Sequence, residues 1–525
     1  NSILETLLDR LEKFSIDEIR ILSYAAVIGH DFHFEFLIKL SCMDEFDFLM
    51  DDMLTVVDKA LFERIIERNQ TSARRSYRFV HNGIMEALIN KFDKTKMNRL
   101  NVYCAEILEN DNHYNPDEVL FAIAHYYNRT DREDKKYHYN ELAYQKSFST
   151  YAIKETVYYL KKVVDYLIDN RQFNNATLEK ALTLASYMQL TGDISGSFHY
   201  IDFALLVAND MGDVIKQVQA KLTSGIGYLY LSDTEKAGDK FLEAISLAEE
   251  NKIELKQGVP YRLAGSACWF SSKFEKAKYY YTKAISYLAP EDYENLAPAY
   301  GLRAWCHIMT GNIKSALEDV NKLELFINFL HDSLLLPYSF HHAAIVYAFL
   351  NQEEKALKYS QKTYEYGEKM NNIIAVFSSY LSQSFYYLFK GDFDNTISTV
   401  NTALDFSGKN KTYLGIDYFY GNLAEAYLWK KEYEKAYSVT QKNFHSPGLN
   451  IYPLCQMIAV QSVYLYLKGN IEGALNRLDE ARDIYEKHNA VPANAFNLFF
   501  RWKLLELTGN QKESKKAEKL FKRLF

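Results

Sequence analysis

The sequence is poor in residues that interrupt regular structure or cross-link it. Among 525 residues there are 8 prolines and 21 glycines, fewer than in an average protein. No apolar run approaches the ~18 residues that a membrane-spanning helix needs, so we expect no membrane partner. The cysteines Cys42, Cys104, Cys268, Cys306 and Cys455 are far apart and form no CxxC pair. This pattern predicts reduced thiols in a cytoplasmic protein and argues against a disulfide framework.

The sequence also lacks the motifs of common catalytic and cofactor sites. There is no GxxxxGK[ST], HExxH, GxSxG or GxGxxG. His30, His33 and Cys42 have no fourth zinc ligand at a suitable spacing. The net charge of −7 argues against a surface dedicated to nucleic acid or anionic lipid. We therefore expect a protein that is not an enzyme and that holds no cofactor and no metal.

What the sequence does have is a repeat, from about residue 178 to the end of the chain. A small residue recurs every 38 to 40 positions, at Ala185, Gly225, Gly265, Ala304, Ala344, Ser384, Ala424 and Ser462. Twelve residues after each stands another short side chain: Ser197, Ala237, Ala277, Ala316, Ala356, Thr396, Ala436 and Ala474. Seven residues further on, alanine recurs at Ala204, Ala244, Ala284, Ala403 and Ala481. Gly-Asp or Gly-Asn pairs separate the first two small residues in several copies.

The repeat predicts pairs of helices whose backbones approach closely at the small residues and which stack into a superhelix. The first helices are predicted to begin near Pro116, Pro260, Pro298, Pro337, Pro453 and Pro492. The spacing of small residues resembles the tetratricopeptide repeat, stretched to 40 residues. HEAT repeats share the length but not this spacing. We expect an all-α fold: a tetratricopeptide-like right-handed α-superhelix of about nine 40-residue helix pairs, with a small β-hairpin near the N-terminus.

Residues 1–110 do not repeat and are predicted to form a winged-helix-like module. Residues 111–177 are predicted to be an irregular helical transition into the repeats of residues 178–525. The elements expected in the module are helices Asp17–Ile28, 33–41 and 43–59, strands Leu61–Arg68 and Tyr77–His81, and helices 82–91 and 94–110. Three helices followed by a hairpin is the order of a winged helix.

Three segments of the first 150 residues carry a family resemblance. They read ILSYAAVIGHDFHFEFLIKL, RRSYRFVHNGIMEALINKF and AIAHYYNRTDREDKKYHYNELAYQKSF. They resemble the C-terminal winged-helix and tetratricopeptide-repeat region of bacterial STAND-class regulators, which are predicted AAA-type signal-transduction ATPases. The resemblance implies an ATPase domain N-terminal to Asn1 in the full-length protein, because this chain has no P-loop. We interpret the chain as a fragment of such a protein, since it begins without methionine.

The charge of the predicted DNA-reading helix argues against DNA as a partner. Residues 43–60 carry Asp44, Glu45, Asp47, Asp51, Asp52 and Asp58 against Lys59. These carboxylates would face phosphates spaced ~1.7 Å apart. The hairpin does carry Arg64, Arg68, Arg74, Arg75 and Arg78. A peptide-responsive transcription regulator that binds DNA through this module therefore remains an alternative.

A ligand is expected in the concave groove that the first helices line. If the first small residue of each unit is position 8, positions 2, 5, 9 and 12 share one helix face. The candidates on that face are Arg262, Trp269, Trp305, Tyr338, His341, Tyr418 and Glu425. Aromatic residues and arginine in a groove are common anchors of recognition, although Trp269 and Trp305 could instead pack between units.

The predicted function is a ligand- or protein-binding sensor and scaffold, with a protein, peptide or small effector in the groove. A pure assembly scaffold, joining copies through the basic last repeat, is a further alternative.

Overall fold

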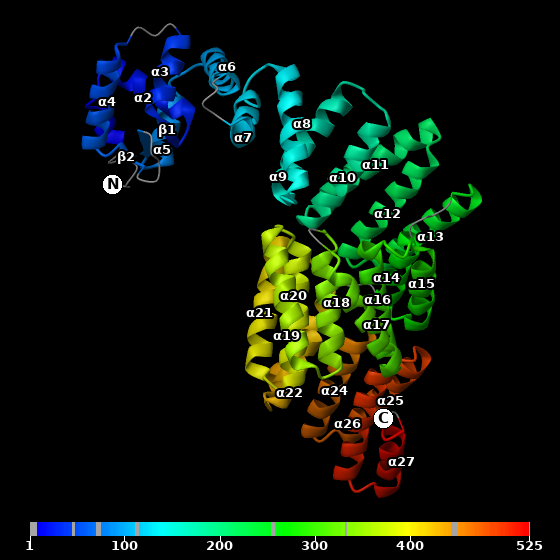
Figure 1. Ribbon diagram of the computed structural model, residues 1–525. Coiled ribbons are helices and arrows are strands. Elements are labelled where there is room, and N and C mark those ends of the chain that lie inside the picture. Colours follow the sequence, from blue (N-terminus) through cyan, green and yellow to red (C-terminus); the bar gives the residue numbers. More distant parts are fainter. Residues whose placement is uncertain are drawn as a thin grey trace. The chain divides into compact units, whose positions relative to one another are not determined.

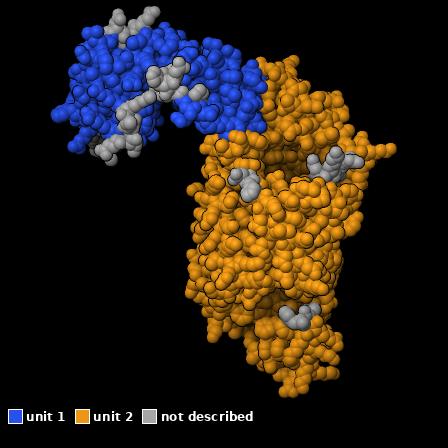
Figure 2. All heavy atoms as spheres, viewed as in Figure 1, with its two compact units in different colours: residues 1–147, 159–166 blue, residues 148–158, 167–525 orange. Residues whose placement is uncertain are grey.

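The computed structural model describes residues 8–44, 48–69, 75–110, 115–253, 258–330, 333–442 and 450–523 (Figure 1). The chain divides into two compact units (Figure 2). The smaller unit comprises residues 1–147 and 159–166, and the larger comprises residues 148–158 and 167–525. Within these described ranges, no helix is both long enough and apolar enough to cross a membrane.

The smaller unit combines helices with a small sheet. Its elements are α2 (Ile16–Ile28), β1 (Asp31–His33), α3 (Phe34–Met43), α4 (Met50–Phe62), β2 (Ile66–Arg68), β3 (Ser76–Phe79), α5 (Asn82–Ile89), α6 (Lys94–Asn110), α7 (Pro116–Tyr127) and α8 (Glu133–Ser149). Ser15 begins α2 with a capping box, in which its hydroxyl accepts from the Glu18 N–H and the Glu18 carboxylate accepts from the Ser15 N–H. The three strands are antiparallel in the order β1-β3-β2. The expected hairpin is therefore present, and β1 is an additional strand that the sequence did not predict.

The predicted acidic helix 43–59 is wrong in its extent. α3 ends at Met43 and α4 begins at Met50, so Asp44 belongs to neither helix. Its side chain is 1% exposed and forms ion pairs with Lys96 and Arg99. Asp44 is thus an internal anchor of the unit and adds nothing to an acidic surface. Glu45, Asp47 and Arg74 lie outside the described residues.

The larger unit is the predicted superhelix of helix pairs (Figure 1). α9 (Ile153–Asp169) is shared between the units, because its residues 159–166 belong to the smaller one. After it, nine pairs follow one another in the described residues from 175 onward. They are α10 (Asn175–Leu190) with α11 (Ile194–Met211), α12 (Val214–Tyr230) with α13 (Thr234–Glu250), α14 (Val259–Phe270) with α15 (Phe274–Tyr287), α16 (Tyr293–Met309) with α17 (Ile313–Ile327), α18 (Leu336–Phe349) with α19 (Glu353–Lys369), α20 (Ile373–Lys390) with α21 (Phe393–Asn410), α22 (Ile416–Trp429) with α23 (Tyr433–Thr440), α24 (Ile451–Leu467) with α25 (Ile471–Lys487), and α26 (Val491–Leu507) with α27 (Gln511–Phe521). The predicted transition region also contains the regular helices α7, α8 and α9.

Close contact between the two helices of each pair depends on the small residues. All eight first small residues and all eight second ones are buried. A Cβ atom added at Gly225 in α12 would lie 2.3 Å from the ring of Phe241 in α13, and one added at Gly265 in α14 would lie 2.6 Å from the ring of Tyr281 in α15. Both distances are shorter than van der Waals contact, so no larger side chain fits without separating the helices.

One proline does not stand where the repeat register predicts. Pro116, Pro260, Pro337 and Pro492 lie in the first turns of their helices. Pro298 lies inside α16. This helix begins one turn earlier than expected, because the Asp292 side chain caps it by accepting from the N–H of Asn295 at 3.2 Å. Pro298 has no N–H and therefore cannot continue the helical hydrogen-bond pattern at its position.

Successive turns of the superhelix touch each other. The Ile451 N–H donates to Ser272 Oγ at 2.9 Å, and the Ser232 hydroxyl donates to the carbonyl of Tyr413 at 3.2 Å. Further along, Asn489 Nδ2 donates to Glu275 Oε1 at 3.1 Å. These bonds join residues about 180 to 215 positions apart. The coil is therefore closed on itself, and the faces of its first helices meet.

Two glycine-to-alanine changes within one helix pair test the role of the small residues. Gly225→Ala is expected to lower the free energy of unfolding by about 1–3 kcal/mol, because the new methyl group overlaps Phe241. The control, Gly238→Ala in α13, meets only Ala267 at 3.8 Å. It is expected to raise stability by up to about 1 kcal/mol through better helix propensity. Urea unfolding followed by circular dichroism measures both, and equal effects would contradict this packing.

Candidate ligand-binding site

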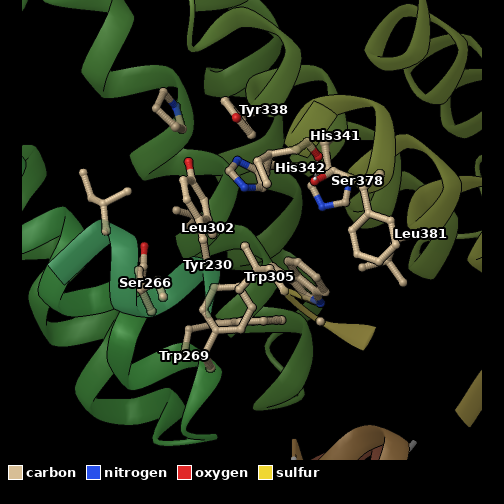
Figure 3. Close-up of a pocket in the computed structure, with 18 of the residues that line it drawn as sticks. Tyr230, Ser266, Trp269, Leu302, Trp305, Tyr338, His341, His342, Ser378 and Leu381 are labelled. Carbon is tan, nitrogen blue, oxygen red and sulfur yellow. Dashed lines mark hydrogen bonds between the residues drawn. The ribbon is translucent and has the colours of Figure 1, made fainter. Parts of the chain in front are cut away.

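The first helices of six successive pairs, α12, α14, α16, α18, α20 and α22, surround a cavity of about 190 Å³ (Figure 3). Its walls are mostly apolar, with Leu229, Leu302, Phe377, Leu381 and Phe419 among the lining residues. The cavity exists because small residues turn one face of each first helix toward its own partner helix. The remaining face of each first helix is left to point toward the axis of the coil.

The structure brings six of the seven predicted site residues to this cavity. Those six are Arg262 and Trp269 on α14, Trp305 on α16, Tyr338 and His341 on α18, and Tyr418 on α22. They come from four helices that span about 160 residues of sequence. The choice of helix face at positions 2, 5, 9 and 12 therefore identified side chains that lie together in space.

The expectation of a water-facing groove is wrong for Trp269, Trp305 and Tyr418, and the alternative that the two tryptophans pack between units is confirmed. Trp269 is 1% exposed, Trp305 3% and Tyr418 1%. The two indole rings have centroids 4.0 Å apart, and Tyr418 stacks on Trp269 at 5.8 Å. Contact between successive turns explains the burial, because it places α22 opposite α14. These three rings are part of the core and also form part of the cavity wall.

Glu425 does not belong to the site. It is 8% exposed and is not among the residues that line the cavity. Its carboxylate accepts from Gln456 Nε2 at 2.6 Å and from Trp429 Nε1 at 3.0 Å, and burial raises its pKa. The helix face was assigned correctly at Tyr418, but two turns later the same face of α22 packs against α24.

Other lining residues were missed. Ser266, Ser378 and Leu381 occupy the same helix face as the predicted residues, and the positional rule would have found them had it not been restricted to aromatic and charged side chains. Tyr230 and His342 also line the cavity, but each is one residue away from a helix position that the rule selects. No signal in the sequence distinguishes them from core residues.

Arg262 gives the cavity a positive charge. Burial lowers the pKa of Arg262, but a guanidinium keeps its proton in proteins. Burial also lowers the pKa of His341 to about 4 and that of His342 well below its usual value. Both imidazoles are therefore neutral at pH 7. Over the part of the chain that the structure describes, no three His, Cys, Asp or Glu side chains are grouped as metal ligands would be.

Several polar atoms of the lining residues are buried without a hydrogen-bond partner. They are Arg262 Nε, Trp269 Nε1, Trp305 Nε1, His341 Nδ1, His342 Nδ1 and the Tyr418 hydroxyl. Buried polar groups are satisfied in the great majority of cases. Other such atoms occur elsewhere in the described residues, for example Ser462 Oγ and Tyr485 Oη, but these six belong to residues that line one cavity. Such a group is typical of a site that a ligand completes. Tyr338 differs, because its hydroxyl donates to Asn372 Oδ1 at 3.2 Å.

Comparison with known proteins shows the fold. No protein-family model matches the chain, and no curated protein matches its sequence. Among solved structures, a Rap protein complexed with competence and sporulation factor is similar with a TM-score of 0.51 and 13% identity, over 67% of this chain and 98% of that one. NprR in complex with its cognate peptide NprX has a TM-score of 0.41 and 14% identity, over 58% and 88%.

A STAND protein with a tetratricopeptide repeat sensor from Pyrococcus horikoshii has a TM-score of 0.36 and 12% identity, over 98% of this chain and 68% of that one. The similarity to the Rap protein extends over two thirds of the chain. It shows that the chain has a tetratricopeptide-like helical repeat fold.

Proposed function

We propose that this chain is the ligand-binding sensor and scaffold region of a STAND-class signalling regulator, with no catalytic activity of its own. The ligand is a peptide, a segment of a protein or a small effector that occupies the cavity of the superhelix. The observation that carries the proposal is the group of unpartnered polar atoms around that cavity. A second support is the fold shared with a Rap protein whose structure was solved with competence and sporulation factor.

The contacts between turns suggest how binding is relayed. The cavity is lined by α12 to α22, and hydrogen bonds such as that from Ile451 to Ser272 connect α24 to the turn before α15. A ligand that contacts α14 and α22 together would stabilise the closed coil. In the proposal, the smaller unit passes this change to an ATPase domain elsewhere in the full-length protein. A Walker motif upstream in the full-length gene product is the expected observation.

Filling the cavity tests whether it binds the ligand. Ser378→Phe adds a ring at a lining position of α20, and it is expected to weaken the binding of peptides or effectors at least tenfold by occupying their space. Ser398→Phe, at an exposed position of α21, is the matched control and is expected to leave affinity unchanged. Tryptophan fluorescence measures binding in a Trp429→Phe, Trp502→Phe background, which leaves only the two tryptophans of the cavity wall. Equal affinity of the two serine variants would contradict the assignment.

DNA is not expected to bind. Asp51, Asp52 and Asp58 lie exposed on α4, and Arg78 of the hairpin is paired with Asp31 at 2.8 Å. Phosphates would meet repulsion from α4 and reduced attraction from the hairpin. We expect no mobility shift of duplex DNA by the chain at low salt. A shift that weakens steeply with added salt would support the transcription-regulator alternative.

A further inference from the structure

We propose that the cavity binds an aromatic group that carries a carboxylate, and that Arg262 is the anchor for this carboxylate. The inference names the ligand class of the site proposed above and rests on that proposed function. Two kinds of ligand have this chemistry: a free arylalkanoic acid, and the C-terminal aromatic residue of a peptide. Both present a ring and a carboxylate a few bonds apart.

The first argument is the missing counter-ion of Arg262. Its side chain has no hydrogen bond and no ion pair with any residue in the described ranges. The two carboxylates that act on it electrostatically belong to Asp292 and Glu294. Asp292 caps α16 at the N–H of Asn295, and Glu294 accepts from Ser333 Oγ at 2.6 Å. Arg262 is partly buried and only its Nε is fully enclosed. A cation that is withdrawn from water without a counter-ion destabilises a protein, so an anion from outside the chain is the natural partner.

The second argument is the kind of polar group that lacks a partner. A guanidinium and an indole N–H can only donate hydrogen bonds. Arg262, Trp269 and Trp305 therefore all need an acceptor, and the Tyr418 hydroxyl can donate as well. A carboxylate has two oxygens and about four acceptor positions. It matches this set of donors, whereas an ammonium group could use only the imidazole nitrogens and hydroxyl groups of the lining and would leave these three side chains unpaired.

The third argument is the shape and polarity of the remaining wall. Leu302, Phe377 and Leu381 face the cavity, and the neutral imidazoles of His341 and His342 add no charge. The volume of about 190 Å³ exceeds that of a cavity of roughly 150 Å³ that holds benzene. One aromatic ring with a short chain fits this space, and the stacked rings of the wall favour an aromatic neighbour.

Calorimetry with paired probes tests the carboxylate. The small pair is phenylacetate and its neutral analogue phenylacetamide. The peptide pair is a pentapeptide ending in phenylalanine, prepared as the free acid and as the C-terminal amide. With the full chain at pH 7, we expect the acid of at least one pair to bind at least tenfold more tightly than its amide. Which pair binds more tightly identifies the source of the carboxylate.

A charge-removing variant tests the anchor. Arg262→Met replaces the guanidinium-bearing side chain with a long, uncharged one. It is expected to abolish the preference for acid over amide. Because it also removes an unpaired, partly buried cation, we expect its melting temperature without ligand to equal or exceed that of the native protein. Arg129→Met makes the same charge change at an exposed position of the smaller unit. This control is expected to retain the preference for the acid.

The outcomes separate the two proposals. Equal binding of acid and amide would overturn the carboxylate inference while leaving ligand binding in the cavity intact. An unchanged preference in Arg262→Met would overturn the role of Arg262. If no probe of either pair binds, the carboxylate inference fails, and the serine variants described above decide the proposed function separately.

Discussion

The close approach of two helices at small residues is the constraint on which the rest of this structure depends. Gly225 and Gly265 each lie against an aromatic ring of the partner helix, with no room for a single added carbon atom. Because this contact recurs about every forty residues, each helix pair is rotated on the last by a similar amount. The rotations sum to a coil whose successive turns touch, as the bond from Ile451 to Ser272 shows.

Contact between turns converts a groove into a cavity. It places α22 opposite α14, so Tyr418 stacks on Trp269, and both are withdrawn from water. The same closure partly buries Arg262 without a counter-ion and leaves indole N–H groups without acceptors. Such groups weaken a folded protein and persist where function requires them. The cavity is thus one place where this protein gives up stability, in addition to unpartnered atoms elsewhere in the helix pairs such as Ser462 Oγ and Tyr485 Oη.

The smaller unit is held together differently. Its carboxylate Asp44 is buried among Lys96, Arg99 and the Tyr24 hydroxyl, whereas the acidic residues of α4 remain on its surface. An internal ion-pair cluster fixes the junction between α3 and α4 and depends on all of its members. The positive charge of the hairpin is reduced by the pair between Arg78 and Asp31.

The sequence by itself determined the helix pairs, their number in the described repeats and the face that lines the cavity. These depend on contacts within about twenty residues, and the spacing of small and apolar side chains encodes them directly. Only the tertiary structure decided the burial of Trp305, the separation of Glu425 from the site and the inclusion of His342. Strand β1 was missed for the same reason, since it pairs with β3 some 45 residues away. Such contacts depend on the summed geometry of many residues or whole repeats, which no local pattern records.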